Sequence, residues 1–311
     1  MPFDSAEAAR KASFVQFAYN MFGDSTNLTP PADPGIAASG YDLLLHLKAK
    51  DFKDEKFYGY LAKSRTNPGD FVLAIRGTEN LAEWLLDFAA LPVLFTPAPE
   101  AGFVALGFLS IFNSFTFVDA AGTESNLNDT ITRLNATAPI SSLTIAGHSL
   151  GGALATLAAA DVAIANPSGV RDKLTLWTFG SPRVGLLDFA ATCNKVVKTS
   201  FRIWNTLDVV PQVPTFPFIH VSGLGDQIVQ TEDQLKTLIV TPACEHHIAT
   251  YQWLLHSAAF PLGVSCDAAT SDLLTPHIAA VTPRARGLSA DRPQILELGG
   301  QTLYLAMRGH R

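Results

Sequence analysis

The chain has 311 residues, a formal net charge of −6 and a sequence pI near 5.7. Hydrophobic residues make up 48% and charged residues 16% of it, a balance that supports a large buried core and excludes intrinsic disorder. A mildly acidic chain without basic runs does not fit a nucleic-acid-binding protein, and the lack of an 18-residue apolar run argues against a membrane span.

The N-terminal half of the sequence is predicted to mix helices and strands. Helices are expected over residues 5–22 and 36–49, separated by the proline-rich segment LTPPADPG. Two strands, KFYGYLAKS and DFVLAIRG, follow around a turn at RTNPGD. Further helices are expected at LAEWLLDF, ALGFLSIFNSF and SNLNDTITRLNA.

From Leu143 onward, apolar strand runs alternate with helices. The segments LTIAG, KLTLWTFG and SFRIWN indicate strands, and SLGGALATLAAADVAIA and ACEHHIATYQWLLHSA indicate helices. Such alternation predicts an α/β fold with a mostly parallel central sheet and helices on both faces. In the tail, alternation around Gly299 and Gly300 predicts a hairpin.

The segment GHSLG, from Gly147 to Gly151, fits the nucleophile-elbow pattern G-x-S-x-G, with a strand run before it and a helix pattern after it. In this motif the serine occupies a strained turn, and the glycines let neighbouring backbone pass closely. The helix N-terminus directs its positive dipole end at the serine. Ser149 is therefore the predicted nucleophile; the alternative is a structural turn with an incidental serine.

A serine hydroxyl needs a base and an orienting acid, which follow it in the order Asp then His in elbow hydrolases. Asp208 follows the strand SFRIWN in a loop at the carboxyl edge of the sheet, where catalytic groups gather, and is the predicted acid. Asp161 and Asp172 lie within or just after the elbow helix and are expected to point elsewhere. Asp188 is expected to be a solvated or capping residue.

His246 and His247 are the candidate bases, because they lie at the start of the last core helix and can approach the sheet edge. Adjacent helical residues point about 100° apart, so only one of the two can face the serine. The other histidines are expected elsewhere: His46 on a helix surface, His148 turned away from the serine hydroxyl, His220 on a strand with a backbone contact, and His256, His277 and His310 on the surface or in the tail.

Two backbone amides are predicted to form an oxyanion hole. One belongs to Leu150, which follows the nucleophile, and the other to Thr78, where the strand FVLAIR ends and Gly77 lets the chain turn. Loss of one such donor typically costs roughly 3–4 kcal/mol of transition-state stabilisation.

The stretches RGTENLAEWLLDF, GHSLGGALA, TFGSPRVG, NTLDVVPQVP and HHIATY occur in this order between about residues 56 and 256. In this respect the chain resembles the fungal-type class 3 lipases of the α/β-hydrolase fold. The resemblance implies a Ser149–Asp208–His246 triad and an oxyanion hole at Thr78 and Leu150.

Two details of the resemblance concern single positions. The family often has a tyrosine a few residues after the catalytic histidine, and the five-residue step to Tyr251 favours His246, whereas members with a shorter step leave His247 open. Many members also have a histidine before the Gly-Phe pair, where this chain has Ala105 and Leu106. This departure bears on substrate preference and leaves the triad unaffected.

In fungal members a short helix after the oxyanion residue acts as a lid, and its equivalent here is residues 79–88, with apolar residues continuing to 95. Apolar residues recur in it at helical spacing: Leu81, Trp84, Leu85 and Phe88. Such a stripe is typical of a core-facing helix. The other interpretation is a mobile lid that covers an acyl pocket and, when open, contacts lipid.

These features predict one domain over residues 1–311, with a core at about 56–256, N-terminal helices in 1–50 and an appendage at about 265–311. The expected activity is that of a serine carboxylic ester hydrolase, first of all a triacylglycerol lipase. A phospholipase A1 or feruloyl-type esterase, an acyltransferase and a non-catalytic lipid-binding protein are the alternatives. Neither a metal nor an organic cofactor is expected, and the expected partner is a lipid or other ester substrate, with transient lipid contact near residues 79–95.

The three cysteines, Cys193, Cys244 and Cys266, are expected to be free thiols, with a Cys244–Cys266 disulfide as the alternative. The N-terminus lacks a basic region followed by an apolar one. A cytoplasmic location is therefore expected if Met1 is the native start, and secretion if the sequence is a trimmed mature form.

Overall fold

The computed structural model describes residues 3–23, 26–51, 54–78, 90–221, 226–229, 245–256, 294–298 and 301–305. Its α-helices are α1 (Ser5–Met21), α2 (Pro34–Ala38), α4 (Leu106–Phe112), α5 (Leu127–Thr137), α6 (Leu150–Ala165), α7 (Leu187–Val196) and α9 (Ile248–His256). Short 3₁₀ turns are η1 (Pro99–Ala101), η2 (Pro167–Lys173) and η3 (Val210–Gln212). The strands of the main sheet are β1 (Tyr41–Asp51), β2 (Asp54–Ser64), β3 (Asp70–Ile75), β6 (Thr116–Val118), β7 (Glu124–Ser125), β8 (Ser142–His148), β9 (Leu174–Phe179), β10 (Ser200–Asn205) and β11 (Asp226–Val229).

The described strands of the main sheet are arranged in the order β11-β10-β9-β8-β3-β2-β1-β6-β7. From β3 to β11 neighbouring strands are parallel. From β3 to β7 they are antiparallel. The sheet is therefore mixed: the expected parallel arrangement holds where helices connect the strands, and an antiparallel arrangement forms the other half.

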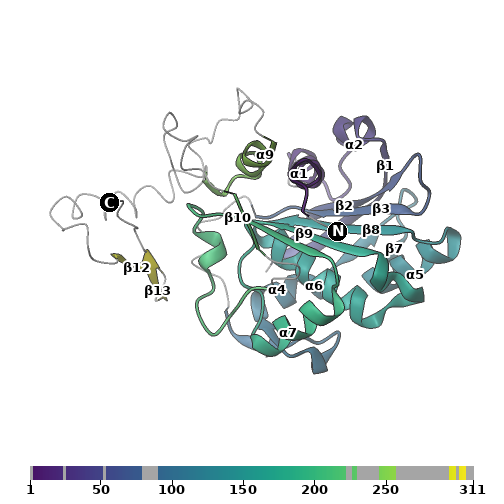
Figure 1. Ribbon diagram of the computed structural model, residues 1–311. Helices are drawn as coiled ribbons and strands as arrows, with labels where there is room; N and C mark the ends of the chain where they lie inside the picture. Colours follow the sequence, from purple (N-terminus) through teal and green to yellow (C-terminus); the bar gives the residue numbers. More distant parts are fainter. Residues whose placement is uncertain are drawn as a thin grey trace.

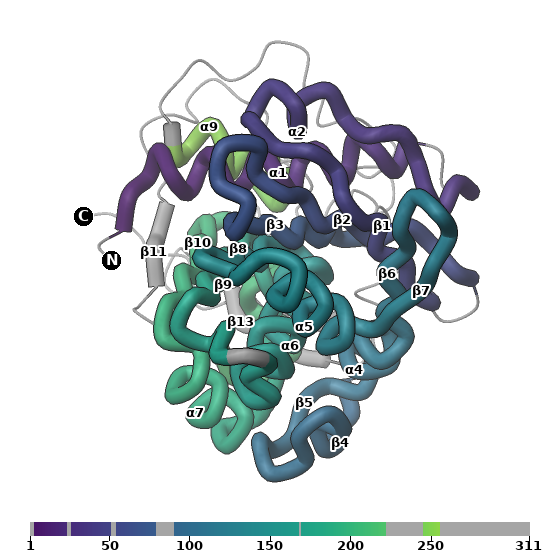
Figure 2. The backbone as a smooth tube through the Cα atoms, turned by 90° about the vertical axis from the view of Figure 1, so that its right-hand side faces the viewer, coloured from purple at the N-terminus to yellow at the C-terminus, as the bar shows by residue number. Residues whose placement is uncertain are grey.

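Helices cover both faces of this sheet, as expected for an α/β fold. Helices α1, α2 and α9 lie on one face, and α4, α5, α6 and α7 lie on the other (Figures 1 and 2). On the first face α1 packs against α9 and β8, and on the second α6 packs against β8 and β9. Strand β8 is consequently buried between the two helical layers.

The segment 36–49, predicted as a helix, is mainly a strand. A short helix, α2, ends at Ala38, and β1 begins at Tyr41. Within β1 the side chains of Leu45, Leu47 and Ala49 are buried, while the residues between them are half-buried. This two-residue period is the pattern of a strand that packs one face on the core, and it outweighs the helical propensity of leucine and lysine.

The parallel strands bring distant parts of the chain to one edge of the sheet. Strands β3, β8, β9 and β10 run in the same direction and end at Ile75, His148, Phe179 and Asn205. The residues that follow these ends carry the predicted site. Ligands of open α/β sheets bind at this carboxyl edge.

Two short hairpins complete the described structure. Strand β4 (Pro92–Leu94) pairs with β5 (Phe103–Ala105). In the tail, β12 (Gln294–Leu298) pairs antiparallel with β13 (Gln301–Leu305), which confirms the hairpin predicted there.

Among the described residues, no helix combines the length and apolar character needed to cross a membrane. Cys193 is a buried free thiol, as expected. Cys244 and Cys266 lie outside the described residues, as do His277, His310 and residues 79–89 of the predicted lid.

Candidate active site

Ser149 occupies a strained turn between β8 and α6. Its backbone has φ 58° and ψ −131°, a region that residues with a side chain rarely adopt. Its N–H donates to the carbonyl oxygen of Phe179, 3.0 Å away at the end of β9. Such backbone strain costs of order 1–3 kcal/mol and persists where the surrounding structure enforces it. The conformation agrees with the nucleophile-elbow motif.

The two glycines of the motif are required by close backbone contacts. A Cβ atom at Gly147 would lie 2.1 Å from the carbonyl oxygen of Gly151. A Cβ atom at Gly151 would lie 2.4 Å from the carbonyl oxygens of Ile75 and Arg76. Glycine at these positions thus lets α6 start directly over the ends of β8 and β3.

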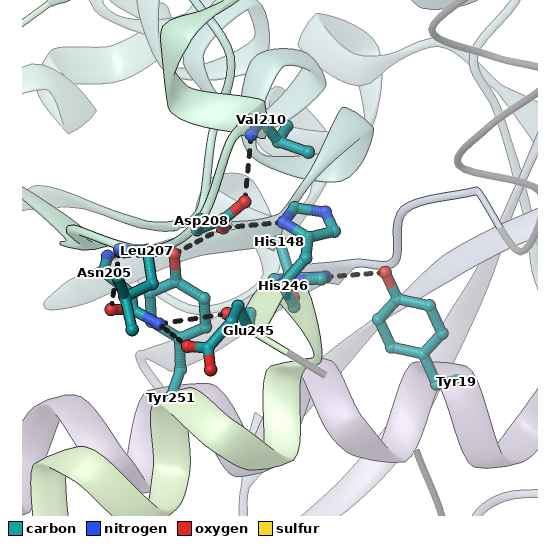
Figure 3. A network of polar contacts seen from close by, with 9 residues as sticks. All are labelled: Tyr19, His148, Asn205, Leu207, Asp208, Val210, Glu245, His246 and Tyr251. Carbon is teal, nitrogen blue, oxygen red and sulfur yellow. Dashed lines mark hydrogen bonds and ion pairs between the residues drawn. The ribbon is translucent and has the colours of Figure 1, made fainter. Parts of the chain in front are cut away.

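Asp208 is held in the loop after β10 by hydrogen bonds to both carboxylate oxygens (Figure 3). Oδ1 accepts from the backbone N–H of Val210 at 2.9 Å. Oδ2 accepts from Nδ1 of His246 at 2.7 Å and from the hydroxyl of Tyr251 at 2.7 Å. The Asp208 side chain is fully buried, so this carboxylate is dry and fixed in orientation.

The hydrogen bond to Asp208 determines which ring nitrogen of His246 can act as a base. Because a carboxylate only accepts, Nδ1 carries the proton and Nε2 of the neutral ring is free to accept one. Nε2 of His246 and Oγ of Ser149 are both buried, and neither has a hydrogen-bond partner among the described residues. Two buried polar atoms without partners indicate a site prepared for a further ligand or for each other.

The end of β9 brings these two atoms to the same edge of the sheet. Phe179 accepts a hydrogen bond from the Ser149 backbone. A Cβ atom on the next residue, Gly180, would lie 3.2 Å from Cε1 of His246 and 2.8 Å from Oδ2 of Asp208. Residues 179 and 180 therefore touch the serine on one side and the Asp–His pair on the other.

The two predicted oxyanion donors flank Ser149. Leu150 is the first residue of α6 and follows the serine directly. On the other side, a Cβ atom at Gly77 would lie 2.7 Å from Cβ of Ser149, and Thr78 is the next residue. Arg76 donates through Nη1 to the carbonyl oxygen of Gly77 at 2.7 Å, which fixes the peptide that carries the Thr78 N–H.

The segment that carries much of this geometry resembles a known family. Residues 72–218 match the family model for lipase (class 3). Over this segment, a little under half of its length, the chain is similar to the class 3 lipases. Over 178 residues it is 34% identical to phospholipase A1-Ialpha2, chloroplastic, of Arabidopsis thaliana, an alignment that covers 51% of this chain and 37% of that protein. Over 199 residues it is 28% identical to a lipase of Rhizomucor miehei, covering 60% of this chain and 51% of that one.

A solved structure of the Rhizomucor miehei lipase propeptide complex shares the fold of this chain. It superposes with a TM-score of 0.60 at 21% sequence identity, over 85% of this chain and 80% of that chain. This likeness shows the α/β-hydrolase fold. The chain spans about half or less of the length of the two curated relatives, at 51% and 37%.

The two candidate histidines differ in their contacts. Asp208 pairs with His246, which precedes α9. His247 is half-buried, and its Nδ1 accepts from the backbone N–H of Ala249 at the start of α9. Burial, and to a smaller extent the neighbouring His246, lowers the pKa of His247. The structure therefore gives His247 a local capping contact.

Three other histidines, His46, His148 and His220, make backbone contacts. His46 lies on strand β1, where a helix surface was expected, and its Nε2 contacts the carbonyl oxygen of Pro30 at 2.8 Å. His220 contacts the carbonyl oxygen of Pro211 through Nε2 at 2.7 Å, which confirms the expected backbone contact. It belongs to no strand, although its neighbour Ile219 pairs with Gly185 in a single β-bridge. His148 is buried and contacts Tyr19 and the backbone of His246.

The other downstream acids lie away from this cluster. Asp161 accepts hydrogen bonds from Asn128, and burial raises its pKa. Asp172 pairs with Lys198. Asp188 is exposed in the first turn of α7, in agreement with the solvated position expected as one alternative. It accepts from the N–H of Phe189, whereas the N-cap of α7 is Leu186.

Several residues of the network were not assigned from the sequence. Asn205, at the end of β10, donates to the buried carboxylate of Glu245 at 2.6 Å, and its N–H donates to the Tyr251 hydroxyl at 3.1 Å. Burial above all, and then the charge of Asp208, raises the pKa of Glu245 against the opposing hydrogen bond from Asn205. The tyrosine of HHIATY was the one sequence signal for this network.

The described end of the predicted lid segment is partly built into the core. Phe95 is buried against the rings of Phe112 and Phe189, which agrees at this residue with the core-facing interpretation. Leu91 and Leu94 are 62% and 45% exposed. The described residues contain no group of three or more His, Cys, Asp or Glu side chains that could hold a metal ion.

Proposed function

We propose that this protein is a serine carboxylic ester hydrolase that cleaves fatty acyl esters of glycerol lipids. Triacylglycerol lipase is the first candidate for its activity. One observation carries the proposal. Nε2 of His246 and Oγ of Ser149 are buried without partners at the edge where β9 ends, and Asp208 holds the opposite nitrogen of the ring at 2.7 Å. Acyl transfer to a serine requires a hydroxyl nucleophile, a base that accepts its proton and an acid that orients the base, and Ser149, His246 and Asp208 fit these three roles.

The proposed first step forms an acyl-enzyme. Nε2 of His246 removes the proton of Ser149 while Oγ attacks the ester carbonyl, and the backbone N–H groups of Thr78 and Leu150 stabilise the oxyanion. The imidazolium then gives its proton to the departing alcohol. Asp208 stabilises the charged ring and stays ionised throughout.

The second step releases the fatty acid. Water enters the place of the alcohol, His246 removes one of its protons, and the hydroxide attacks the acyl carbonyl. The second tetrahedral intermediate collapses with return of the proton to Ser149, which regenerates the enzyme. This chemistry uses only side chains and backbone amides of the chain.

The first experiment tests the nucleophile. Ser149→Ala is expected to fold and to lose hydrolysis of p-nitrophenyl esters by about 10⁴-fold or more, because the residual rate of triad-deficient serine hydrolases is that small. A p-nitrophenyl alkylphosphonate is expected to label Ser149 alone, as read by peptide mass spectrometry. Ser181→Ala is the control, since Ser181 is also buried but donates to the backbone of Pro182. Hydrolysis by the Ser149 variant close to the wild-type rate would refute the proposal.

A phospholipase A1 is the second candidate, because the Arabidopsis relative with that activity in its name is 34% identical to this chain. Emulsified triacylglycerol, phosphatidylcholine vesicles and a feruloyl ester separate the candidates by the rate of acid release. Added short alcohols that become acylated would indicate an acyltransferase. Specific lipid binding without turnover or phosphonate labelling would indicate a lipid-binding protein.

The proposal includes one domain and transient contact with a lipid surface near residues 79–95. Packing of α1 against α9 and β8 supports a single unit of N-terminal helix and core. Exposure of Leu91 and Leu94 supports an apolar surface beside the segment that follows Thr78. Vesicle co-sedimentation of the wild type and of Leu91→Ser with Leu94→Ser tests the contact, and equal binding would count against it.

A further inference from the structure

Tyr19, near the end of α1, joins two parts of the candidate site. The backbone N–H of Gly77 donates to its hydroxyl oxygen at 2.7 Å, directly before the predicted oxyanion donor Thr78. The same oxygen lies 2.8 Å from Nδ1 of His148 (Figure 3). Nε2 of His148 lies 2.6 Å from the carbonyl oxygen of His246. Tyr19 lies outside the matched family segment, residues 72–218.

The chemistry of the partners determines the direction of each hydrogen bond. The carbonyl of His246 can only accept, so Nε2 of His148 carries a proton. Burial, above all, lowers the pKa of His148 well below its usual value, so the ring is neutral and Nδ1 accepts. Tyr19 then donates to Nδ1 while accepting from Gly77. The result is one directed chain from Gly77 through Tyr19 and His148 to His246.

We propose that Tyr19 is a positioning residue of the active site: through this chain it holds the strand end beside the oxyanion hole and, by way of His148, the backbone of His246. The inference rests on the proposed function. It follows from the geometry that one hydroxyl on α1 constrains two elements that must keep a fixed separation during catalysis. Tyr19 holds the N–H of Gly77 and Arg76 holds its carbonyl oxygen, so loss of the Tyr19 hydroxyl removes one of two hydrogen bonds that fix this residue.

Removal of the hydroxyl leaves the Gly77 N–H and Nδ1 of His148 without this partner. Relaxation of either group moves Thr78 or His246 by a fraction of an ångström. Small misplacements of reacting groups lower the rate of the chemical step far more than they lower substrate binding, with losses of up to about 100-fold per ångström. The expected signature is a fall in kcat with KM nearly constant.

Tyr19→Phe and Tyr60→Phe form a matched pair. Tyr60 is buried on β2, and its hydroxyl donates to the carbonyl oxygen of Phe14 on α1 at 2.9 Å. Each variant loses one hydroxyl that ties α1 to the sheet, but only Tyr19 contacts the site. With a soluble p-nitrophenyl ester, Tyr19→Phe is expected to lower kcat about 10-fold or more with KM within about twofold, and Tyr60→Phe to leave both near wild type. Equal effects of the two variants on kcat would overturn the proposal.

A measurement on the unaltered protein covers the case in which Tyr19→Phe does not fold. Nitrogen-15 NMR of the histidine side chains, assigned with His148→Gln, is expected to show His148 neutral, with the proton on Nε2 and an accepting Nδ1. A proton on Nδ1 would overturn the directed chain.

Failure of this inference differs from failure of the proposed function. Suppose that the wild type hydrolyses esters, that Ser149→Ala abolishes this activity, and that Tyr19→Phe and Tyr60→Phe have equal rates. These results overturn only the inference about Tyr19 and leave the proposed function standing. Absence of wild-type hydrolysis and of phosphonate labelling overturns the proposed function and this inference with it.

Discussion

Nδ1 of His246 lies 2.7 Å from Oδ2 of Asp208, and both side chains are almost completely withdrawn from solvent. In such a setting the carboxylate fixes the tautomer and the orientation of the ring at once. Two further lone pairs of Asp208 accept from the Val210 N–H and the Tyr251 hydroxyl. All three partners of this carboxylate are donors and together they use both of its oxygens, so an amide, which has one accepting oxygen, cannot satisfy all of them.

Asp208→Asn tests this requirement. The amide of asparagine can take two orientations. In one, its N–H groups would face the Val210 N–H; in the other, they would face His246 and Tyr251, and His246 would change tautomer. We expect kcat for p-nitrophenyl esters to fall by about 10⁴-fold, as in other triads with this substitution. Asp172→Asn, which removes only the exposed pair with Lys198, should retain wild-type kcat. A loss below tenfold in Asp208→Asn would show that the pair is structural.

The strained backbone of Ser149 predicts opposite effects of one substitution on stability and activity. At φ 58° and ψ −131° glycine is unstrained, whereas alanine retains the strain. Ser149→Gly should therefore be more stable than Ser149→Ala by roughly 1 kcal/mol, after the entropy cost of glycine, and both should be inactive. Urea denaturation of the two variants measures the difference. A more stable alanine variant would mean that the turn relaxes without cost.

Gly147→Ala should damage the fold itself. The new Cβ would lie 2.1 Å from a backbone oxygen of Gly151, and a backbone atom cannot rotate away as a side chain can. We expect a loss of about 3 kcal/mol or more in the free energy of unfolding, the upper end of overpacking costs. Gly23→Ala is the control, because its Cβ would be in ordinary contact, 3.5 Å from the Asn20 carbonyl oxygen, and a change within about 0.5 kcal/mol is expected. Thermal unfolding of both proteins would show whether they differ.

Glu245 predicts a dependence of stability on pH. Burial, above all, raises the pKa of its carboxyl in the folded protein. The stability that this group contributes is therefore fully present below its unfolded pKa and is lost as the pH rises through the folded pKa. Glu245→Gln lacks this titration, so its stability relative to wild type should rise from acidic to neutral pH. Urea unfolding across that range measures the difference, and a constant or falling difference would contradict the raised pKa.

Much of this architecture follows from local sequence patterns. The run from Leu143 to Ala165 predicted β8, the elbow and α6, because apolar strand residues, glycines at close contacts and small helical residues each restrict the backbone locally. The strands from Leu174 and Ser200 were predicted for the same reason. The segment 36–49 was predicted wrongly, because its alternating burial depends on pairing with β2 and β6, which are distant in the sequence.

The amino-acid sequence by itself determined where the serine turn lies, and it placed Asp208 after a strand, because both are properties of a few consecutive residues. Tertiary packing decided that Asp208 meets His246 while His247 contacts Ala249, and that Tyr19 on α1 contacts Gly77 and His148. Apart from the local His247–Ala249 contact, these contacts join segments separated by tens of residues or more. Their geometry is set by how α1 and α9 pack against the sheet, and no local pattern records that packing.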